Sequence, residues 1–114
     1  ALDPRPGHLP FFEKNLDRVG LMESFGFIES YQKYVVCLND DAALDDAALR
    51  LRGMATDMSQ NTFKRFAATK GIADMRNALR KKGDTERADL LGRYITEIKE
   101  KETDQMILMY YNMF

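Results

Sequence analysis

Apolar residues recur every three or four positions along most of this chain, which is the period of an amphipathic α-helix. The pattern starts after Pro10, a residue suited to the first turn of a helix, and continues to about Leu38. We predict a long helical segment here, which Gly20 either interrupts or leaves intact. Its apolar positions are Phe11, Phe12, Leu16, Val19, Leu21, Phe25, Ile28, Tyr31, Val35 and Leu38.

Capping residues divide the middle of the chain. Asn-Asp-Asp at positions 39–41 ends the first helical segment and offers an N-cap to the next, whose apolar stripe starts at Leu44. Residues 59–62 interrupt this stripe, which then resumes and ends at Gly71, a suitable C-cap. The pattern predicts a short helix over residues 72–82, closed by Gly83.

The last stretch, residues 84–114, is predicted to form one long helix with Asp84 as its N-cap. From Met106 to Phe114 this helix is apolar on every side, and a small protein rarely leaves such a surface in water. The segment therefore folds back on its own bundle or docks on another subunit. Docking is the favoured interpretation, because a terminus that is apolar all round exceeds what one short bundle usually covers. Methionine side chains also adapt to irregular partner surfaces.

These segments predict an all-α fold, a small bundle of about five helices with a long C-terminal helix. Residues 11–114 would form one helical domain, and residues 1–10, which hold all three prolines, an extended arm. Hydrophobic residues make up 45% and charged residues 31%, as in ordinary globular proteins. No apolar run approaches the roughly 20 residues of a transmembrane helix. The single cysteine, Cys37, permits no internal disulfide and suits an intracellular reducing compartment.

Residues that could support catalysis or bind a metal are few. A metal site needs three or four convergent ligands, but His8 and Cys37 are the only residues of their kinds and lie on different segments. Cys37 follows two valines and precedes Leu38, so we predict a buried structural thiol. The aspartates at 40, 41, 45 and 46 lack the spacing of a calcium loop, and no phosphate-binding glycine loop occurs. We therefore predict no catalytic, metal or cofactor-binding residue, no cofactor, and a protein that is not an enzyme.

Basic residues cluster between positions 64 and 82, although the net charge of the chain is only −1. One acid, Asp74, lies among seven bases. A solvated or partner-facing surface is the favoured interpretation; an acidic protein patch, phospholipid headgroups in a peripheral membrane contact, or nucleic acid are the others. The seven basic residues are Lys64, Arg65, Lys70, Arg76, Arg80, Lys81 and Lys82.

Residues 36–104 resemble a known family in several short motifs. These are Leu38 with Asp40-Asp41, Ala48-Leu49-Arg50-Leu51-Arg52, Phe63-Lys64-Arg65, Leu79 before Lys81-Lys82-Gly83, and Leu90-Leu91 with Tyr94-Ile95. They resemble the small matrix-side subunit of mitochondrial ubiquinol–cytochrome c reductase, the ubiquinone-binding protein subunit. The family has prolines in two of these motifs, and none follows Leu51 or Leu79 here. The resemblance implies an all-helical accessory subunit without a redox group, on the matrix side of the mitochondrial inner membrane, that helps to assemble and steady cytochrome b.

The sequence thus favours a non-catalytic accessory subunit that binds other protein subunits of a multi-subunit complex. In its most specific form, this complex is the respiratory-chain reductase. The alternatives are a helical nucleic-acid-binding module, which would use the basic residues between 64 and 82, and an enzyme of unrecognised type. The predicted contact residues are Phe11, Phe12, Met106, Met109, Tyr110, Tyr111 and Phe114.

Overall fold

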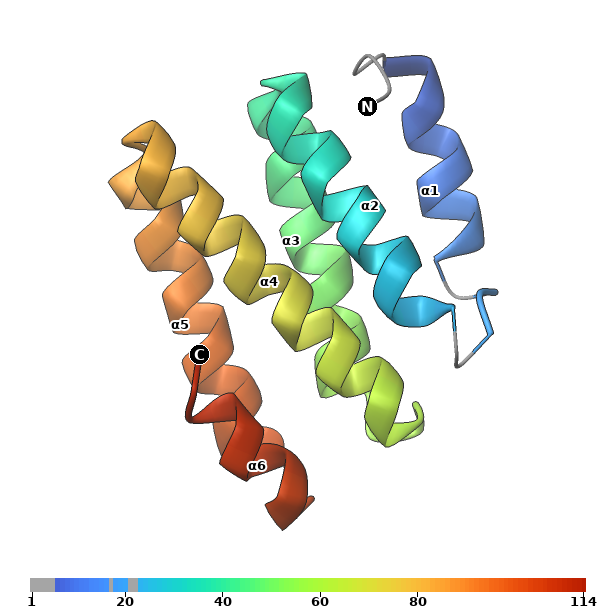
Figure 1. The fold of residues 1–114 in the computed structure, drawn as a ribbon, viewed down its shortest axis with the longest axis vertical. Coiled ribbons are helices and arrows are strands. Elements are labelled where there is room, and N and C mark those ends of the chain that lie inside the picture. The colour runs from blue at the N-terminus through green and yellow to red at the C-terminus, as the bar shows by residue number, and fades with distance from the viewer. Residues whose placement is uncertain (1–5, 17, 21–22) are drawn as a thin grey trace.

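A computed structural model describes residues 6–16, 18–20 and 23–114, and in this part of the chain all regular structure is helical. The all-α prediction is confirmed, with six α-helices among the described residues where about five were expected. A 3₁₀ turn, Pro6–His8, precedes the first of them (Figure 1). The helices are α1 (Leu9–Asn15), α2 (Ser24–Leu38), α3 (Asp41–Thr56), α4 (Thr62–Lys82), α5 (Thr85–Lys101) and α6 (Gln105–Tyr111).

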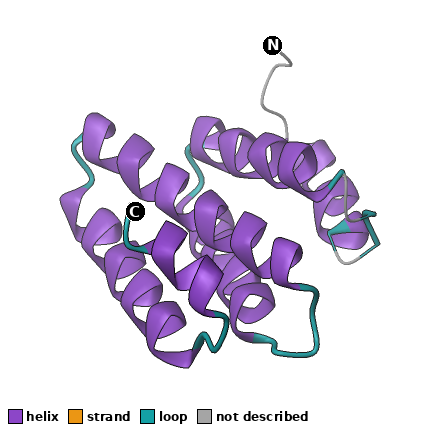
Figure 2. Cartoon of the chain, turned by 60° about the horizontal axis from the view of Figure 1, so that its bottom comes forward, coloured by secondary structure: helices purple, strands orange, loops and turns teal. Residues whose placement is uncertain are grey.

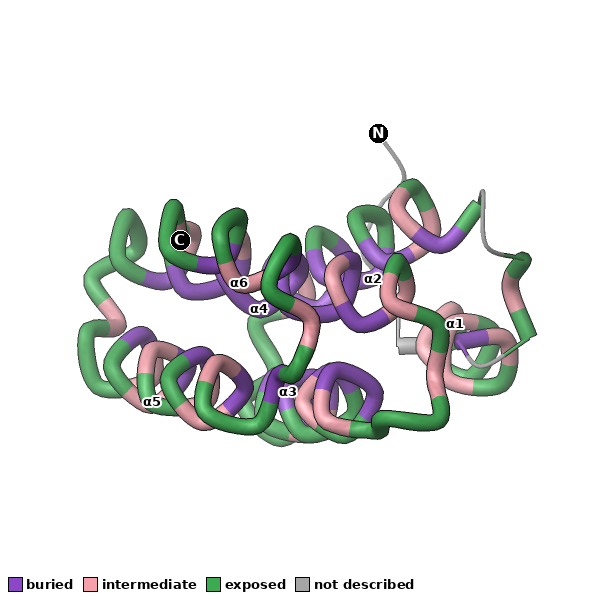
Figure 3. Tube along the Cα trace, turned by 90° about the horizontal axis from the view of Figure 1, so that it is seen from below, coloured by how far each residue is buried: buried purple, intermediate pink, exposed green. Residues whose placement is uncertain are grey.

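The helices form two layers around α4. Helices α2, α4 and α6 lie side by side in one layer, and α3 and α5 lie beneath them in the other (Figures 1 and 3). Helix α4 contacts α2, α3, α5 and α6, and the buried residues gather where the two layers meet (Figure 3). Helix α1 lies on the far side of α2 from α4. Helix α6 is therefore at one side of the structure and α1 at the other, and short loops join the helices between them (Figure 2).

Helix α4 is continuous through Gly71, so the predicted C-cap at this residue is wrong. A Cβ atom at position 71 would lie 2.7 Å from Cγ2 of Ile28 on α2 and 3.3 Å from Cδ1 of Leu51 on α3. A 2.7 Å contact is closer than carbon atoms pack, so glycine permits a close approach of three helices instead of ending one. This role depends on residues distant in sequence, which a local pattern does not show.

Three predicted caps are confirmed. The Asp40 side chain accepts hydrogen bonds from the backbone N–H groups of Ala42 and Ala43 at the start of α3. Gly83 ends α4 in the left-handed conformation, with φ of 87°. Asp84 then caps α5 by accepting a hydrogen bond from the N–H of Arg87.

The predicted long C-terminal helix is wrong, because it consists of two helices. Helix α5 ends at Lys101, Glu102 adopts an extended conformation, and Asp104 caps a new helix by accepting hydrogen bonds from the N–H groups of Met106 and Ile107. The apolar period continues through this corner, which is why the pattern did not predict it. The corner turns α6 back onto α4.

The N-terminal prediction needs two corrections. Residues 6–10 are helical instead of extended, while residues 1–5 lie outside the described part of the chain. The segment predicted over residues 11–38 is interrupted, because α1 ends at Asn15 and α2 begins at Ser24. The alternative with a break near Gly20 is therefore the correct one.

Candidate protein-docking site

Helix α6 has one buried side and one exposed side. Ile107 and Tyr111 face the interior and are 7% and 0% exposed. The other side of α6 and the turn after it present four large apolar side chains, each 55–80% exposed, which we call the α6 outer face. Half of the exposed large apolar side chains in the described residues belong to it. It consists of Met106, Met109, Tyr110 and Met113.

Aromatic rings attach α6 to α4, its neighbour in the same layer. The half-buried ring of Phe66 on α4 lies 5.7 Å from the ring of Tyr110, 6.0 Å from that of Tyr111 and 5.8 Å from that of Phe114, measured between centroids. Phe25 on α2 contacts the same ring at 5.7 Å. Such pairs contribute about 0.5–1.5 kcal/mol each beyond their buried area. The helix that carries the α6 outer face is therefore well packed against the rest of the chain.

The predicted contact residues divide into exposed and buried groups. Tyr111 is fully buried, so its side chain belongs to this chain's own core and is not available to a partner, which corrects the prediction. Burial raises the pKa of Tyr111 to about 12. Phe12 and Phe114 are half-buried, whereas Phe11, on α1, is 61% exposed. One side of α6 thus packs on this chain's own bundle, as one of the two predictions expected, whereas docking of the exposed side on another subunit stays a prediction.

A buried ion pair fixes the corner that precedes α6. The Arg65 guanidinium donates two hydrogen bonds of 3.0 Å to the carboxylate of Glu102, and a third of 2.7 Å to the backbone oxygen of Gln60. The Glu102 carboxylate also accepts the N–H groups of Thr103 and Asp104. Burial by itself would raise the pKa of Glu102, but these hydrogen bonds outweigh it and lower the pKa. The sequence analysis did not identify Glu102, since it is one of several acids on the predicted helix.

Four of the seven basic residues are engaged within the chain, which corrects the predicted basic face. Arg65 is buried with Glu102. Arg76 is also buried and donates a 2.6 Å hydrogen bond to the backbone oxygen of Phe114; burial, with Arg80 nearby, lowers the pKa of Arg76. Lys70 pairs with Asp74 at 2.9 Å, and Lys82 donates to the backbone oxygen of Val36 at 2.9 Å.

The other three cations, Lys64, Arg80 and Lys81, have no ion pair in the described part of the chain. Nucleic-acid binding remains a prediction that none of these contacts tests.

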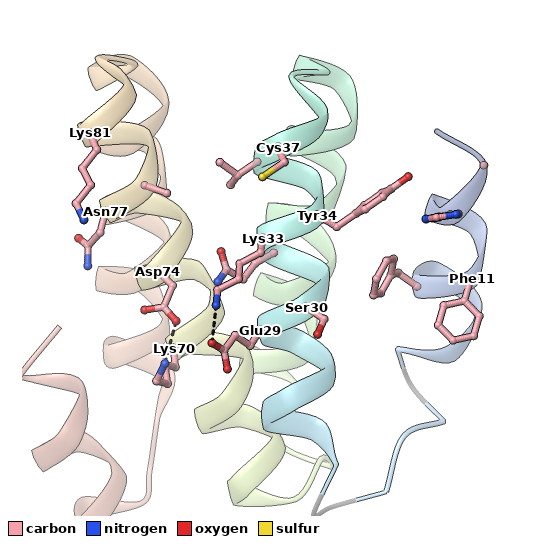
Figure 4. A pocket seen from close by; sticks show the side chains of 16 residues that line it. Phe11, Glu29, Ser30, Lys33, Tyr34, Cys37, Lys70, Asp74, Asn77 and Lys81 are labelled. Carbon is pink, nitrogen blue, oxygen red and sulfur yellow. Dashed lines mark hydrogen bonds and ion pairs between the residues drawn. The ribbon is translucent and has the colours of Figure 1, made fainter. Parts of the chain in front are cut away.

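A groove of about 1270 Å³ extends over the outer side of α2, with α1 on one side and α4 on the other (Figure 4). Towards α4 it is charged, and the Lys33–Glu29 pair on α2 lies across from the Lys70–Asp74 pair on α4. Cys37 lines the groove and is exposed, so the predicted buried thiol is wrong. Val35 and Val36 take the inward positions of this helical turn, and the next residue turns outward.

The aspartates near the start of α3 act as a cap and as ion-pair partners. Asp45 accepts a hydrogen bond of 3.0 Å from Arg87, and Asp46 one of 2.6 Å from Arg50. No group of three or more potential metal ligands comes together among residues 6–16, 18–20 and 23–114. Within the same residues, no helix has both the length and the apolar character needed to cross a membrane.

Comparison of the chain with protein-family models, with curated proteins and with solved structures finds no match.

Proposed function

We propose that this protein is a non-catalytic helical subunit of a larger assembly and that it binds a partner protein through the α6 outer face. The observation that supports this proposal is the 55–80% exposure of four large apolar side chains, three on α6 and the fourth at Met113 just after it. Clusters of this kind on a small domain are typical of protein interaction sites.

The energy available at this face is large for a small domain. Fully burying one side chain of this size contributes roughly 1.5–3 kcal/mol, whereas the net stability of a domain is only about 5–15 kcal/mol. The Arg65–Glu102 pair and the Phe66 ring contacts hold α6 in place before a partner binds. A preformed face loses little conformational entropy on binding, so more of the burial energy appears as affinity.

The face also indicates what kind of partner it would bind. Residues 105–114 contain no charged side chain. Binding there would depend on apolar burial, so it should change little with salt concentration. Methionine side chains, which make up three of the four members of the face, adapt to irregular apolar surfaces.

The resemblance over residues 36–104 supplies the most specific form of the proposal. In that form, the assembly is ubiquinol–cytochrome c reductase, and the chain lies on the matrix side of the mitochondrial inner membrane. The short motifs around Leu38, Ala48 and Tyr94 are its support.

The test compares affinity-tagged chains expressed in the organism that naturally makes this protein. Quantitative mass spectrometry would measure co-purified proteins for the wild type, for the triple variant M106Q/M109Q/M113Q and for L49Q. Leu49 is a matched control, because it is 51% exposed but lies on α3. We expect at least a tenfold loss of specific partners for the triple variant and none for L49Q. Equal partner recovery from all three chains would overturn the proposal, and the identity of the lost proteins would decide its reductase form.

A further inference from the structure

The half of the α2 groove that faces α1 differs from the charged half beside α4. Aromatic rings line it, and neither a carboxylate nor an ammonium group is among its lining side chains (Figure 4). We call this region the aromatic half of the groove. It is lined by Gly7, His8, Phe11, Phe12, Ser30 and Tyr34.

Tyr34 contributes an unused hydrogen-bond donor to this region. The residue is 9% exposed, and its hydroxyl group is buried without a hydrogen-bond partner among the described residues. Figure 4 shows the ring projecting from α2 towards α1, with the hydroxyl at its far end. Leaving a buried hydroxyl unpaired is unfavourable for folding. Because Tyr34 nevertheless keeps such a hydroxyl, we infer that its hydrogen-bond partner is a bound molecule.

Tyr31 provides an internal comparison. Its hydroxyl is also buried, with no partner in the part of the chain that the structure describes. Its ring packs on Phe12 at 5.6 Å, as the ring of Tyr34 does at 5.2 Å. Tyr31 does not line the groove, however, and is 0% exposed. The two residues thus share the same unfavourable burial but differ in access to the groove.

We propose that the aromatic half of the groove binds a small, neutral aromatic molecule with a ketone or ether oxygen, and that Tyr34 donates a hydrogen bond to this oxygen. Apolar walls with a few polar groups are typical of small-molecule sites. The absence of charged side chains among the six lining residues favours a neutral ligand. The Ser30 hydroxyl offers a second polar contact at the exposed rim.

The Tyr34 hydroxyl is buried, so a ligand can reach it only if a neighbouring group moves, and the N-terminal end of α1 is the part that lies against its ring. The His8 ring stacks on Tyr34 with 5.9 Å between centroids and is itself half-exposed. Helix α1 has no buried side chain of its own over residues 9–15 and no side-chain N-cap. It rests on α2 through ring contacts, so displacing the His8 ring would disturb the 3₁₀ turn but none of the longer helices.

The experiment titrates the isotope-labelled full chain with two probes of similar shape, acetophenone and ethylbenzene, which differ in the carbonyl oxygen. Backbone NMR shifts of residues 7–12 and 30–34 report binding in the groove. We expect acetophenone to bind about five- to tenfold more tightly than ethylbenzene. One hydrogen bond to an otherwise unpaired donor accounts for a difference of this size. In Y34F the two probes should bind equally, whereas Y31F should keep the full preference.

Thermal unfolding of the same variants separates binding from folding. Both Y34F and Y31F remove an unpaired buried hydroxyl, so both should unfold at or above the temperature of the wild type. If the preference for acetophenone is lost in Y34F but kept in Y31F, the loss is therefore due to binding in the groove and not to a change in stability. The proposal is overturned if neither probe shifts the groove residues, if both bind the wild type equally, or if Y34F keeps the preference for acetophenone.

Discussion

The Arg65 guanidinium and the Glu102 carboxylate form a buried ion pair with two hydrogen bonds, Nε to Oε1 and Nη2 to Oε2, each 3.0 Å long. Arg65 lies in the first turn of α4, and Glu102 is the C-cap residue that follows the end of α5. The same carboxylate holds the N–H groups of Thr103 and Asp104 in the corner that leads to α6. The position of the proposed docking helix therefore depends on one pair of charges.

Replacing Arg65 alone should destabilise the chain strongly. In R65M, Glu102 stays buried without a counter-charge, and we expect the free energy of unfolding to fall by about 3–5 kcal/mol. The double variant R65M/E102Q removes the buried charge but keeps a side-chain oxygen that accepts hydrogen bonds from the backbone N–H groups. Its free energy of unfolding should therefore fall less than that of R65M. Urea denaturation followed by circular dichroism measures both. Equal losses in the two variants would show that the unpaired charge is not the cause.

The same pair should make stability depend on acid pH. The pKa of Glu102 in the folded chain lies below the usual value of 4.5, because hydrogen bonds from Arg65 and from the backbone outweigh the opposing effect of burial. A lowered folded-state pKa stabilises the fold above the unfolded-state pKa, and this contribution is lost as the pH falls through the folded-state pKa.

We therefore expect the wild type to lose stability more steeply than E102Q as the pH falls below about 4.5, because the glutamine does not titrate there. Urea midpoints measured for both chains at several pH values between about 5 and 3 test this. Parallel curves would mean that Glu102 contributes nothing to the acid sensitivity.

Adding a methyl group at Gly71 should separate the three helices that meet there. The new Cβ would lie 2.7 Å from Cγ2 of Ile28, and relieving such overlap typically costs about 1–3 kcal/mol. Gly53, inside α3, has no atom within 4 Å of its Cβ position, so G53A should instead stabilise the chain by about 0.5–1 kcal/mol. Thermal unfolding of G71A and G53A would therefore shift in opposite directions. A stabilised G71A would contradict the close approach.

The two sides of α6 should respond differently to truncation. Ile107 is 7% exposed, so I107A is expected to lower the free energy of unfolding by about 2–4 kcal/mol. Met109 is 71% exposed, and M109A should stay within about 0.5 kcal/mol of the wild type. Urea denaturation of the isolated chain compares them. A large loss in M109A would mean that the outer face already packs against this chain, which would remove the basis for a docking surface.

The proposed site was partly predictable. The uncharged, methionine-rich composition of residues 106–114 indicated an apolar surface, and three methionines and Tyr110 are exposed as a docking interpretation requires. Which side faces outward was not predictable, because it depends on the corner at Glu102. The burial of Tyr111 follows from that corner, and so does the contact between Arg76 and the backbone of Phe114.

The sequence by itself determined the helical character of the chain and those helix ends that depend on their own neighbours. Asp40, Gly83 and Asp84 act within one helical turn, so their roles are visible in a local pattern. The tertiary structure alone decided that Gly71 would be a point of close packing and that Arg65 would be buried. Their partners, Ile28 and Glu102, are distant in sequence. The apolar period predicts that one face of a helix is buried, but it does not predict which residues pack against that face.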